Sequence, residues 1–179
     1  MFRFILVLLS VLLTACSSVP LSTMVKFSNY DKNDFFRIDP SQLRVKATIN
    51  QVVDIDLSKA TTLSAAIGGR DTNSKLVFQL EQVKTEVIPA VKGVFNNEPA
   101  YKVHYMKLTE QSINNFNQLI KAAENRSDKQ GQFQAGLSWD KPIDAKGETI
   151  VFSVALKLAT DEPYFTLIDQ FELAIPNKE

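Results

Sequence analysis

The sequence predicts an α+β fold, mainly an antiparallel β-sheet or sandwich, with one amphipathic helix. In most of the chain apolar and polar residues alternate with a period of two, which is typical of strands with one buried face. Short segments rich in Gly, Asp and Pro separate these stretches, and strands joined by short connections pair antiparallel. With 179 residues, of which 45% are hydrophobic and 22% charged, the chain can form one globular domain with a sizeable core.

The alternating stretches are the predicted strands. In the first, residues 43–50, every second side chain is apolar, and Arg44 and Lys46 belong to the opposite, solvated set. The remaining predicted strands are residues 61–67, 75–83, 101–108, 133–139, 149–158 and 164–175. In the last strand Asp169 falls among the apolar positions. We expect a β-bulge that shifts the register there, because an unpaired inward carboxylate is costly.

Three groups of turn residues set the expected strand pairs. Gly68–Asn73 links the second and third strands as a hairpin. Residues 140–147 separate the fifth and sixth strands, and residues 161–163 separate the sixth and seventh. We therefore expect each of these neighbouring pairs to be antiparallel.

One helix interrupts the strands, over about residues 109–125. Thr109 is suited to cap its first turn, and Glu110 complements the positive end of the helix dipole. Its apolar stripe consists of Ile113, Phe116, Leu119, Ile120 and Ala123. Such a stripe is typical of a helix packed on a sheet, so we expect this helix to lie across the sheet.

The first fifteen residues differ from the rest of the chain. Arg3 supplies a positive charge, and residues 4–13 are apolar except for Ser10. This is the pattern of a secretory signal peptide. The apolar stretch is shorter than the roughly 20 residues that a membrane-spanning helix needs.

Residues 13–16, Leu-Thr-Ala-Cys, resemble the lipobox of bacterial lipoproteins. In that family the leader is cut before the cysteine, here Cys16, whose thiol carries a diacylglyceryl group. The resemblance implies a mature chain held to a membrane by acyl chains, with residues 16–23 as a lipidated tether and residues 24–179 as one β-rich periplasmic domain. Ser17 differs from the aspartate that retains lipoproteins in the inner membrane, which implies the periplasmic face of the outer membrane. The alternatives are a cysteine buried as a small hydrophobic residue and a chance cysteine beside an ordinary signal-peptide cleavage site.

The residues that could support catalysis are few. Cys16 is the only cysteine and His104 the only histidine, which argues against a thiol nucleophile and against multi-histidine metal sites. Asp54 and Asp56 could share one face of a strand, as a glycosidase or cation-binding pair does, although such pairs are common on solvated faces. Equal numbers of basic and acidic residues, 20 each, give no reason to expect nucleic-acid binding. We expect no cofactor and no metal.

Two stretches rich in large apolar residues are candidates for contact with a partner. The first follows the tether and includes Phe35 and Phe36; alternatively, these side chains cover an end of the sheet. The second is residues 86–95. It forms either a long hairpin with buried edges or an exposed loop in which Val94 and Phe95 are anchors for a partner.

These observations favour a membrane-anchored periplasmic lipoprotein that is not an enzyme and that binds or helps to assemble another envelope protein. The alternative is a carrier of a small ligand or lipid, with a cavity between the sheet and the helix. A third hypothesis, a hydrolase, requires Asp54, Asp56 or His104 to converge in a cleft. Beyond the leader the domain resembles lipoproteins of Gram-negative bacteria to which no activity is assigned.

Overall fold

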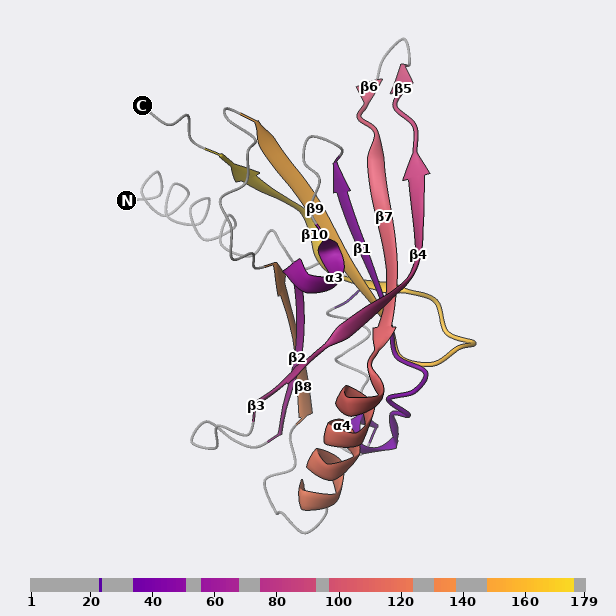
Figure 1. Cartoon of the computed structure of the whole chain (residues 1–179), viewed down its shortest axis with the longest axis vertical. Helices are drawn as coiled ribbons and strands as arrows, with labels where there is room; N and C mark the ends of the chain where they lie inside the picture. The colour runs from indigo at the N-terminus through magenta and orange to yellow at the C-terminus, as the bar shows by residue number, and fades with distance from the viewer. Residues whose placement is uncertain are drawn as a thin grey trace, which may run out of the picture.

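The computed structural model describes Thr23 and residues 34–50, 56–67, 75–92, 97–123, 131–137 and 148–175. Residues 1–22, which include the predicted signal peptide and Cys16, lie outside these ranges. The elements (Figure 1) are η2 (Phe35–Arg37), β1 (Arg44–Asn50), α3 (Leu57–Ala60), β2 (Thr61–Ile67), β3 (Lys75–Phe78), β4 (Leu80–Ile88), β5 (Val91–Lys92), β6 (Asn97–Glu98), β7 (Tyr101–Leu108), α4 (Glu110–Ala123), β8 (Gly131–Leu137), β9 (Thr149–Lys157) and β10 (Phe165–Ala174).

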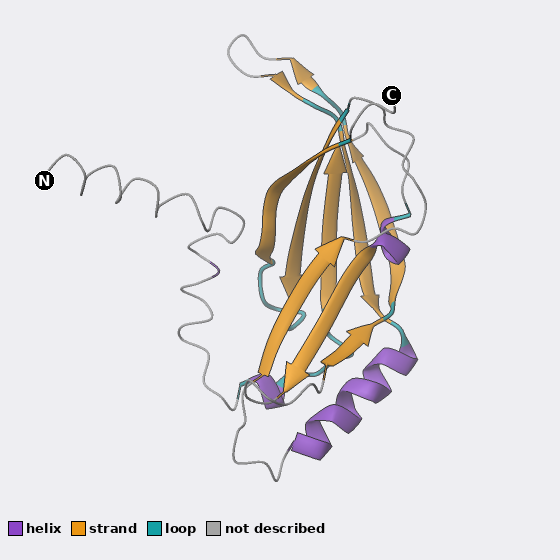
Figure 2. Cartoon of the chain, turned by 90° about the vertical axis from the view of Figure 1, so that its left-hand side faces the viewer, coloured by secondary structure: helices purple, strands orange, loops and turns teal. Residues whose placement is uncertain are grey.

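The described strands form two layers and one small extension. Sheet A has five strands in the order β10-β9-β1-β7-β4, sheet B has the order β3-β2-β8, and β5 and β6 form a two-stranded ladder. All the pairs in these sheets are antiparallel. Figure 2 shows sheet B in front of the lower part of sheet A, with α4 beside it. The prediction of an α+β fold, mainly antiparallel with one long helix, is confirmed.

The core lies between the two sheets, and the period of two in the sequence explains which side chains reach it. On β1 the apolar residues Val45, Ala47 and Ile49 are buried, while the intervening residues are partly exposed. Asn50 ends this strand and is also buried. Its amide replaces ladder hydrogen bonds: Nδ2 donates to the carbonyl oxygen of Thr149 at 2.8 Å, and Oδ1 accepts from the backbone N–H of Val151 at 3.0 Å.

The predicted strand 75–83 is wrong as a single element, because the chain leaves sheet B and enters sheet A at Gln79. This residue separates β3 from β4. The start of α4 satisfies its backbone: the N–H of Gln79 donates to Ser112 Oγ at 2.8 Å, and its carbonyl accepts from the N–H of Thr109 at 3.1 Å. Two strands that alternate in one continuous pattern can thus belong to different sheets.

A second correction concerns the strands on either side of residues 140–147. They do not pair, because β8 pairs with β2 in sheet B and β9 lies between β1 and β10 in sheet A. The predicted hairpins β2–β3 and β9–β10 do form. The bulge predicted near Asp169 is confirmed, since the β10 register shifts between Thr166 and Phe171. Asp169 is exposed there, and Gln170 has a φ of 42°.

Helix α4 covers the end of the sandwich where β3 meets β4. Thr109 caps it as predicted, because its Oγ1 accepts from the N–H of Ser112 at 3.3 Å. Phe116 has no exposed surface, and its ring centroid lies 5.7 Å from that of Phe35 and 5.6 Å from that of Phe78. None of the helices in the described part of the chain is long and apolar enough to cross a membrane.

Candidate functional site

Of the acidic and histidine residues that could support catalysis, the two in the described ranges, Asp56 and His104, belong to different groups of contacts. Asp56 caps the N-terminus of α3, where its carboxylate accepts from Ser58 N at 3.1 Å and from Ser58 Oγ at 2.6 Å. The bond from the Ser58 hydroxyl is the main reason that the pKa of Asp56 lies below its ordinary value. The prediction of a strand position for Asp56 is therefore wrong, and Asp54 lies outside the described residues.

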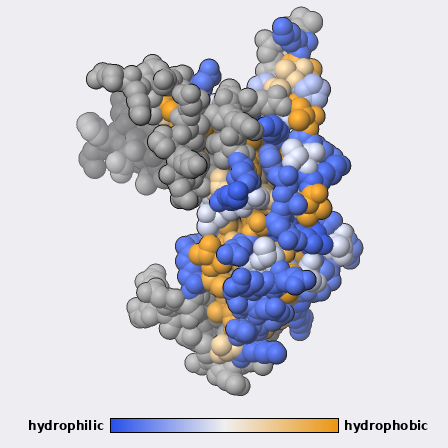
Figure 3. All heavy atoms as spheres, viewed as in Figure 1, coloured by the Kyte–Doolittle hydropathy of each residue, from blue (hydrophilic) through white to orange (hydrophobic). Residues whose placement is uncertain are grey.

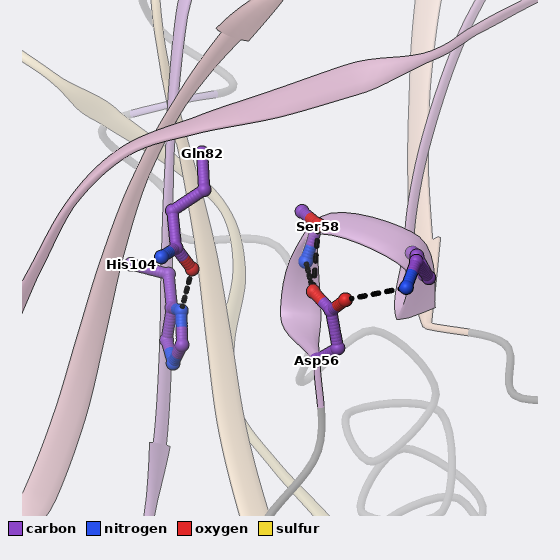
Figure 4. A network of polar contacts seen from close by, with 5 residues as sticks. Asp56, Ser58, Gln82 and His104 are labelled. Carbon is purple, nitrogen blue, oxygen red and sulfur yellow. Dashed lines mark hydrogen bonds and ion pairs between the residues drawn. The ribbon is translucent and has the colours of Figure 1, made fainter.

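His104 belongs to a separate group. It is buried on β7, and its Nδ1 lies 2.7 Å from Oε1 of Gln82 on β4. Figure 4 shows the Asp56–Ser58 and His104–Gln82 contacts side by side, with no hydrogen bond drawn between the two groups. Within the described ranges, no three His, Cys, Asp or Glu side chains are grouped so that they could hold a metal ion. Asp56 thus serves as the cap of α3, and the His104 ring is held by Gln82.

Of the predicted partner contacts Phe35 and Phe36, Phe35 belongs to the core and Phe36 packs against it. Phe35 is 5% exposed and packs against Phe116, while the ring of Phe36 meets that of Phe35 edge-on at 5.8 Å. Phe36 is half-buried against the same cluster. The assignment of Phe35 to a contact surface is corrected here: both rings cover an end of the sandwich, which is the alternative expected for this stretch.

The strongest candidate site is the hairpin at the upper end of sheet A. Strands β4 and β7 pair as far as Ile88 and Tyr101, and the β5–β6 ladder continues them beyond the rest of the sheet (Figures 1 and 2). We call residues 86–92 and 97–101 the arm. The described part of the stretch pairs antiparallel with residues 97–101, as the hairpin alternative predicted, but Val87, Ile88, Val91 and Lys92 are exposed and not buried.

Apolar side chains on the arm are open to solvent. Ile88 is 47% exposed and Val91 is 53% exposed. Figure 3 shows hydrophobic residues at this upper end of the molecule, on the side seen in Figure 1. The two predicted anchors, Val94 and Phe95, lie outside the described residues. Exposed aliphatic groups on a projecting hairpin are typical of a protein contact.

A second candidate site lies on the outer face of sheet A, away from the core. It is a hollow of about 440 Å³. The polar residues that line it include Lys46, Thr48, Tyr105, Ser153, Thr166 and Gln170. The ring of Tyr164 lies beside it, with Lys46 Nζ 5.2 Å and Lys157 Nζ 5.8 Å from its centroid. Burial raises the pKa of Tyr164, so its hydroxyl stays neutral.

This second site could bind a small anion that carries a flat or sugar-like group. Lys46 supplies positive charge within the hollow, and Lys157 adds a second ammonium group beside the neighbouring Tyr164 ring. The hydroxyl groups of Thr48 and Ser153 supply donors. Its position differs from the predicted cavity between sheet and helix. The sequence does not predict this hollow, because its residues are far apart in the chain. The antiparallel register of β9, β1 and β7 brings Lys46, Tyr105 and Lys157 close together, and Tyr164, just before β10, packs beside them.

Comparison with known proteins gives no relative from which a function could be transferred. No family model matches the chain, no curated protein matches it, and no solved structure matches it.

Proposed function

We propose that this chain is a membrane-anchored periplasmic lipoprotein that binds another envelope protein through the arm and catalyses no reaction. The observation that carries the proposal is the exposure of Ile88 and Val91 on a hairpin that extends beyond the sheet. Burying one such aliphatic side chain contributes about 1.5–3 kcal/mol, so two of them can form the centre of a contact.

The other support for the proposal comes from the start of the domain. Thr23 is buried, and its hydroxyl donates to the carbonyl oxygen of Thr166 on β10. If Cys16 carries the acyl chains, six residues lie between it and Thr23, and the seven Cα–Cα steps limit the separation to about 25 Å. An outer-membrane lipoprotein with so short a tether holds its domain next to the headgroups, within reach of other envelope proteins.

Photo-crosslinking in intact cells tests the arm contact. We expect p-benzoyl-phenylalanine at position 91 to give a discrete crosslinked species, and Ile88→Asp to reduce it. The matched control is the same label at position 77, since Val77 is a similarly exposed valine on β3 of sheet B. Equal crosslinking at positions 91 and 77 would contradict the proposal. Cys16→Ser tests the anchor separately, by release of the protein from the membrane fraction.

The hollow on the outer face of sheet A favours a second function, that of a small-ligand carrier. Native mass spectrometry of the full chain, titrated with inorganic phosphate and with glucose 6-phosphate, measures this directly. We expect the sugar phosphate to bind more tightly because Tyr164 can contact its ring. Lys46→Gln combined with Lys157→Gln should abolish binding of both. Failure of both compounds to bind the unaltered chain would remove this alternative.

A further inference from the structure

Strand β4 forms an open edge of sheet A. It is the last strand in the order β10-β9-β1-β7-β4, and one side of it has no neighbouring strand within the described ranges. Residues 81–85 are all exposed, as are Val87 and Ile88. An edge strand presents backbone N–H and C=O groups that can pair with another strand. The residues along this edge therefore determine what can pair with it.

The side chains of this edge are arranged symmetrically about Thr85. On one side of Thr85 stand Lys84 and Val83, and on the other side stand Glu86 and Val87. The two valines are exposed to nearly the same extent, 59% for Val83 and 58% for Val87. The sequence Val-Lys-Thr-Glu-Val is thus complementary to its own antiparallel copy.

Two copies of β4 that pair antiparallel with Thr85 opposite Thr85 match in both charge and hydrophobicity. Lys84 of each copy then lies opposite Glu86 of the other, and Val83 lies opposite Val87. Each contact occurs twice, because a two-fold axis relates the copies. Opposite charges and aliphatic pairs directly across two strands stabilise a sheet.

The neighbouring registers of the same pair are unfavourable. A two-fold axis at Lys84 places two lysines opposite each other, and an axis at Glu86 does the same with two carboxylates. Like charges directly opposite destabilise a strand pair. Charge therefore selects the register centred on Thr85.

The geometry of β4 limits this pairing to a short segment. Its register with β7 shifts between Gln82 and Lys84, so Val83 lies at the bulge. The regular part that two copies centred on Thr85 share is therefore Lys84–Glu86, with a Val83–Val87 pair at each end. Within it Glu86 is already held in place by an ion pair with Lys84 and by the hydroxyl of Tyr105, which donates to Oε2 at 3.0 Å. A bulge at one end discourages extension of an edge into longer aggregates. A short, isologous contact of this kind closes after two copies.

We propose that two copies of this chain associate through β4, antiparallel and centred on Thr85, to join their A sheets into one continuous sheet. This dimer contact shares Glu86 and Val87 with the arm, but it is centred on Thr85 and does not depend on Ile88 or Val91, the residues that carry the arm contact. The two-fold axis is perpendicular to the sheet, so both copies present the same face on the same side. The two N-terminal tethers then leave the dimer on the same side of the joined sheet, so both can be anchored in one membrane.

Disulfide trapping of the full chain in its membrane tests the register. The only native cysteine is Cys16, so Thr85→Cys adds one thiol to each copy at the proposed axis. We expect mild oxidation to give a covalent dimer linked through position 85, as confirmed by mass spectrometry of the linked peptide. Val77→Cys, on the edge of sheet B, is the matched control. A yield at position 85 no greater than at position 77 would overturn the proposal.

Charge reversal then tests the pairing itself. In the Thr85→Cys background, Lys84→Glu alone or Glu86→Lys alone should reduce dimer yield roughly tenfold, because each puts like charges opposite each other at two symmetric places. The double variant Lys84→Glu/Glu86→Lys restores opposite charges and should restore the dimer. Lys107→Glu, which breaks the intrachain pair with Glu81, should leave the yield unchanged.

The charge variants also distinguish a wrong register from misfolding. Loss of the dimer in both single variants without recovery in the double variant would refute the register centred on Thr85. Unchanged urea midpoints for the four charge variants would show that misfolding is not the cause of a lower yield. Crosslinking at position 91 reports on the arm alone, so the failure of one proposal is distinguishable from the failure of the other.

Discussion

Phe116 joins three elements that are distant in the sequence, and its removal tests the packing at the end of the sandwich. The side chain is fully buried and lies against Phe35 of η2 and Phe78 of β3. Truncating a buried phenylalanine to alanine costs about 3–5 kcal/mol, since it removes the transfer free energy and leaves a cavity. We expect Phe116→Ala to lower the free energy of unfolding by this amount.

Phe171→Ala is the matched control, because Phe171 makes an aromatic contact of similar length with Phe152, at 5.3 Å, but is 44% exposed. About half of its surface is already in water and no closed cavity forms, so we expect a cost of about 1–2 kcal/mol. Urea unfolding followed by far-ultraviolet circular dichroism measures both. At a typical slope of about 1–3 kcal/mol per molar urea, Phe116→Ala should lower the midpoint by at least about 1 M.

Equal losses of stability in the two variants, or a loss below about 1 kcal/mol for Phe116→Ala, would refute the packing role assigned to Phe116. Should Phe116→Ala fail to fold, Phe116→Leu retains most of the volume and should show a smaller loss of stability. That loss should still exceed the loss in Phe171→Leu. A matching loss of stability in Phe35→Ala would support its assignment to the core rather than to a partner contact.

Three further predictions concern polar groups. Asn50→Leu leaves two backbone groups without their side-chain partner and should cost about 1–3 kcal/mol in urea unfolding, whereas Asn117→Leu on the exposed side of α4 should cost little. The pKa of Asp56 is lower in the folded state than its ordinary value of 3.8. Its ionised form therefore stabilises the fold fully above pH 3.8, and this contribution is lost as the pH falls through the lower pKa of the folded state. Asp56→Asn keeps a capping side chain, and its stability should fall less on acidification; an equal fall would contradict this assignment. Tyr105→Phe should raise the pKa of Glu86 toward, but not to, 4.5 in an NMR titration, because the hydrogen bond with Lys84 remains the larger cause of the lowered value.

Local patterns in the sequence predicted the elements whose physical causes are themselves local. The position of α4 follows from the Thr109 cap and the spacing of its apolar residues. The bulge in β10 follows from an acidic residue in an apolar series, since a shift in register moves Asp169 to solvent. In both cases the deciding residues lie within or next to the element itself.

The partners of the strands could not be predicted in the same way. Gln79 separates two strands only because Ser112 and Thr109, some thirty residues later in the chain, satisfy its backbone. Likewise, β8 has the alternation of a strand but nothing in that pattern specifies β2, rather than β9, as its neighbour. Alternation determines which face of a strand is buried, and long-range packing determines which sheet it joins.

The candidate sites show the same limit. Val83–Val87 is visible as a symmetric sequence, but its interest depends on β4 being an edge strand, which is a property of the whole sheet. The aromatic content of residues 35–36 suggested a surface for binding, yet packing against Phe116 places Phe35 in the core. A large apolar residue outside a periodic pattern carries no indication of whether it lies inside or outside.

The attachment of Thr23 to β10 has a consequence for the other edge of the sheet. Four strand spacings separate β10 from β4, which at about 4.8 Å each gives roughly 19 Å. If the tether carries lipid, this edge is held at a fixed lateral offset from the anchor, and its diffusion is confined to two dimensions. Confinement raises the effective concentration of one edge around another, so a strand pair too weak to persist in dilute solution can be well populated at the membrane surface.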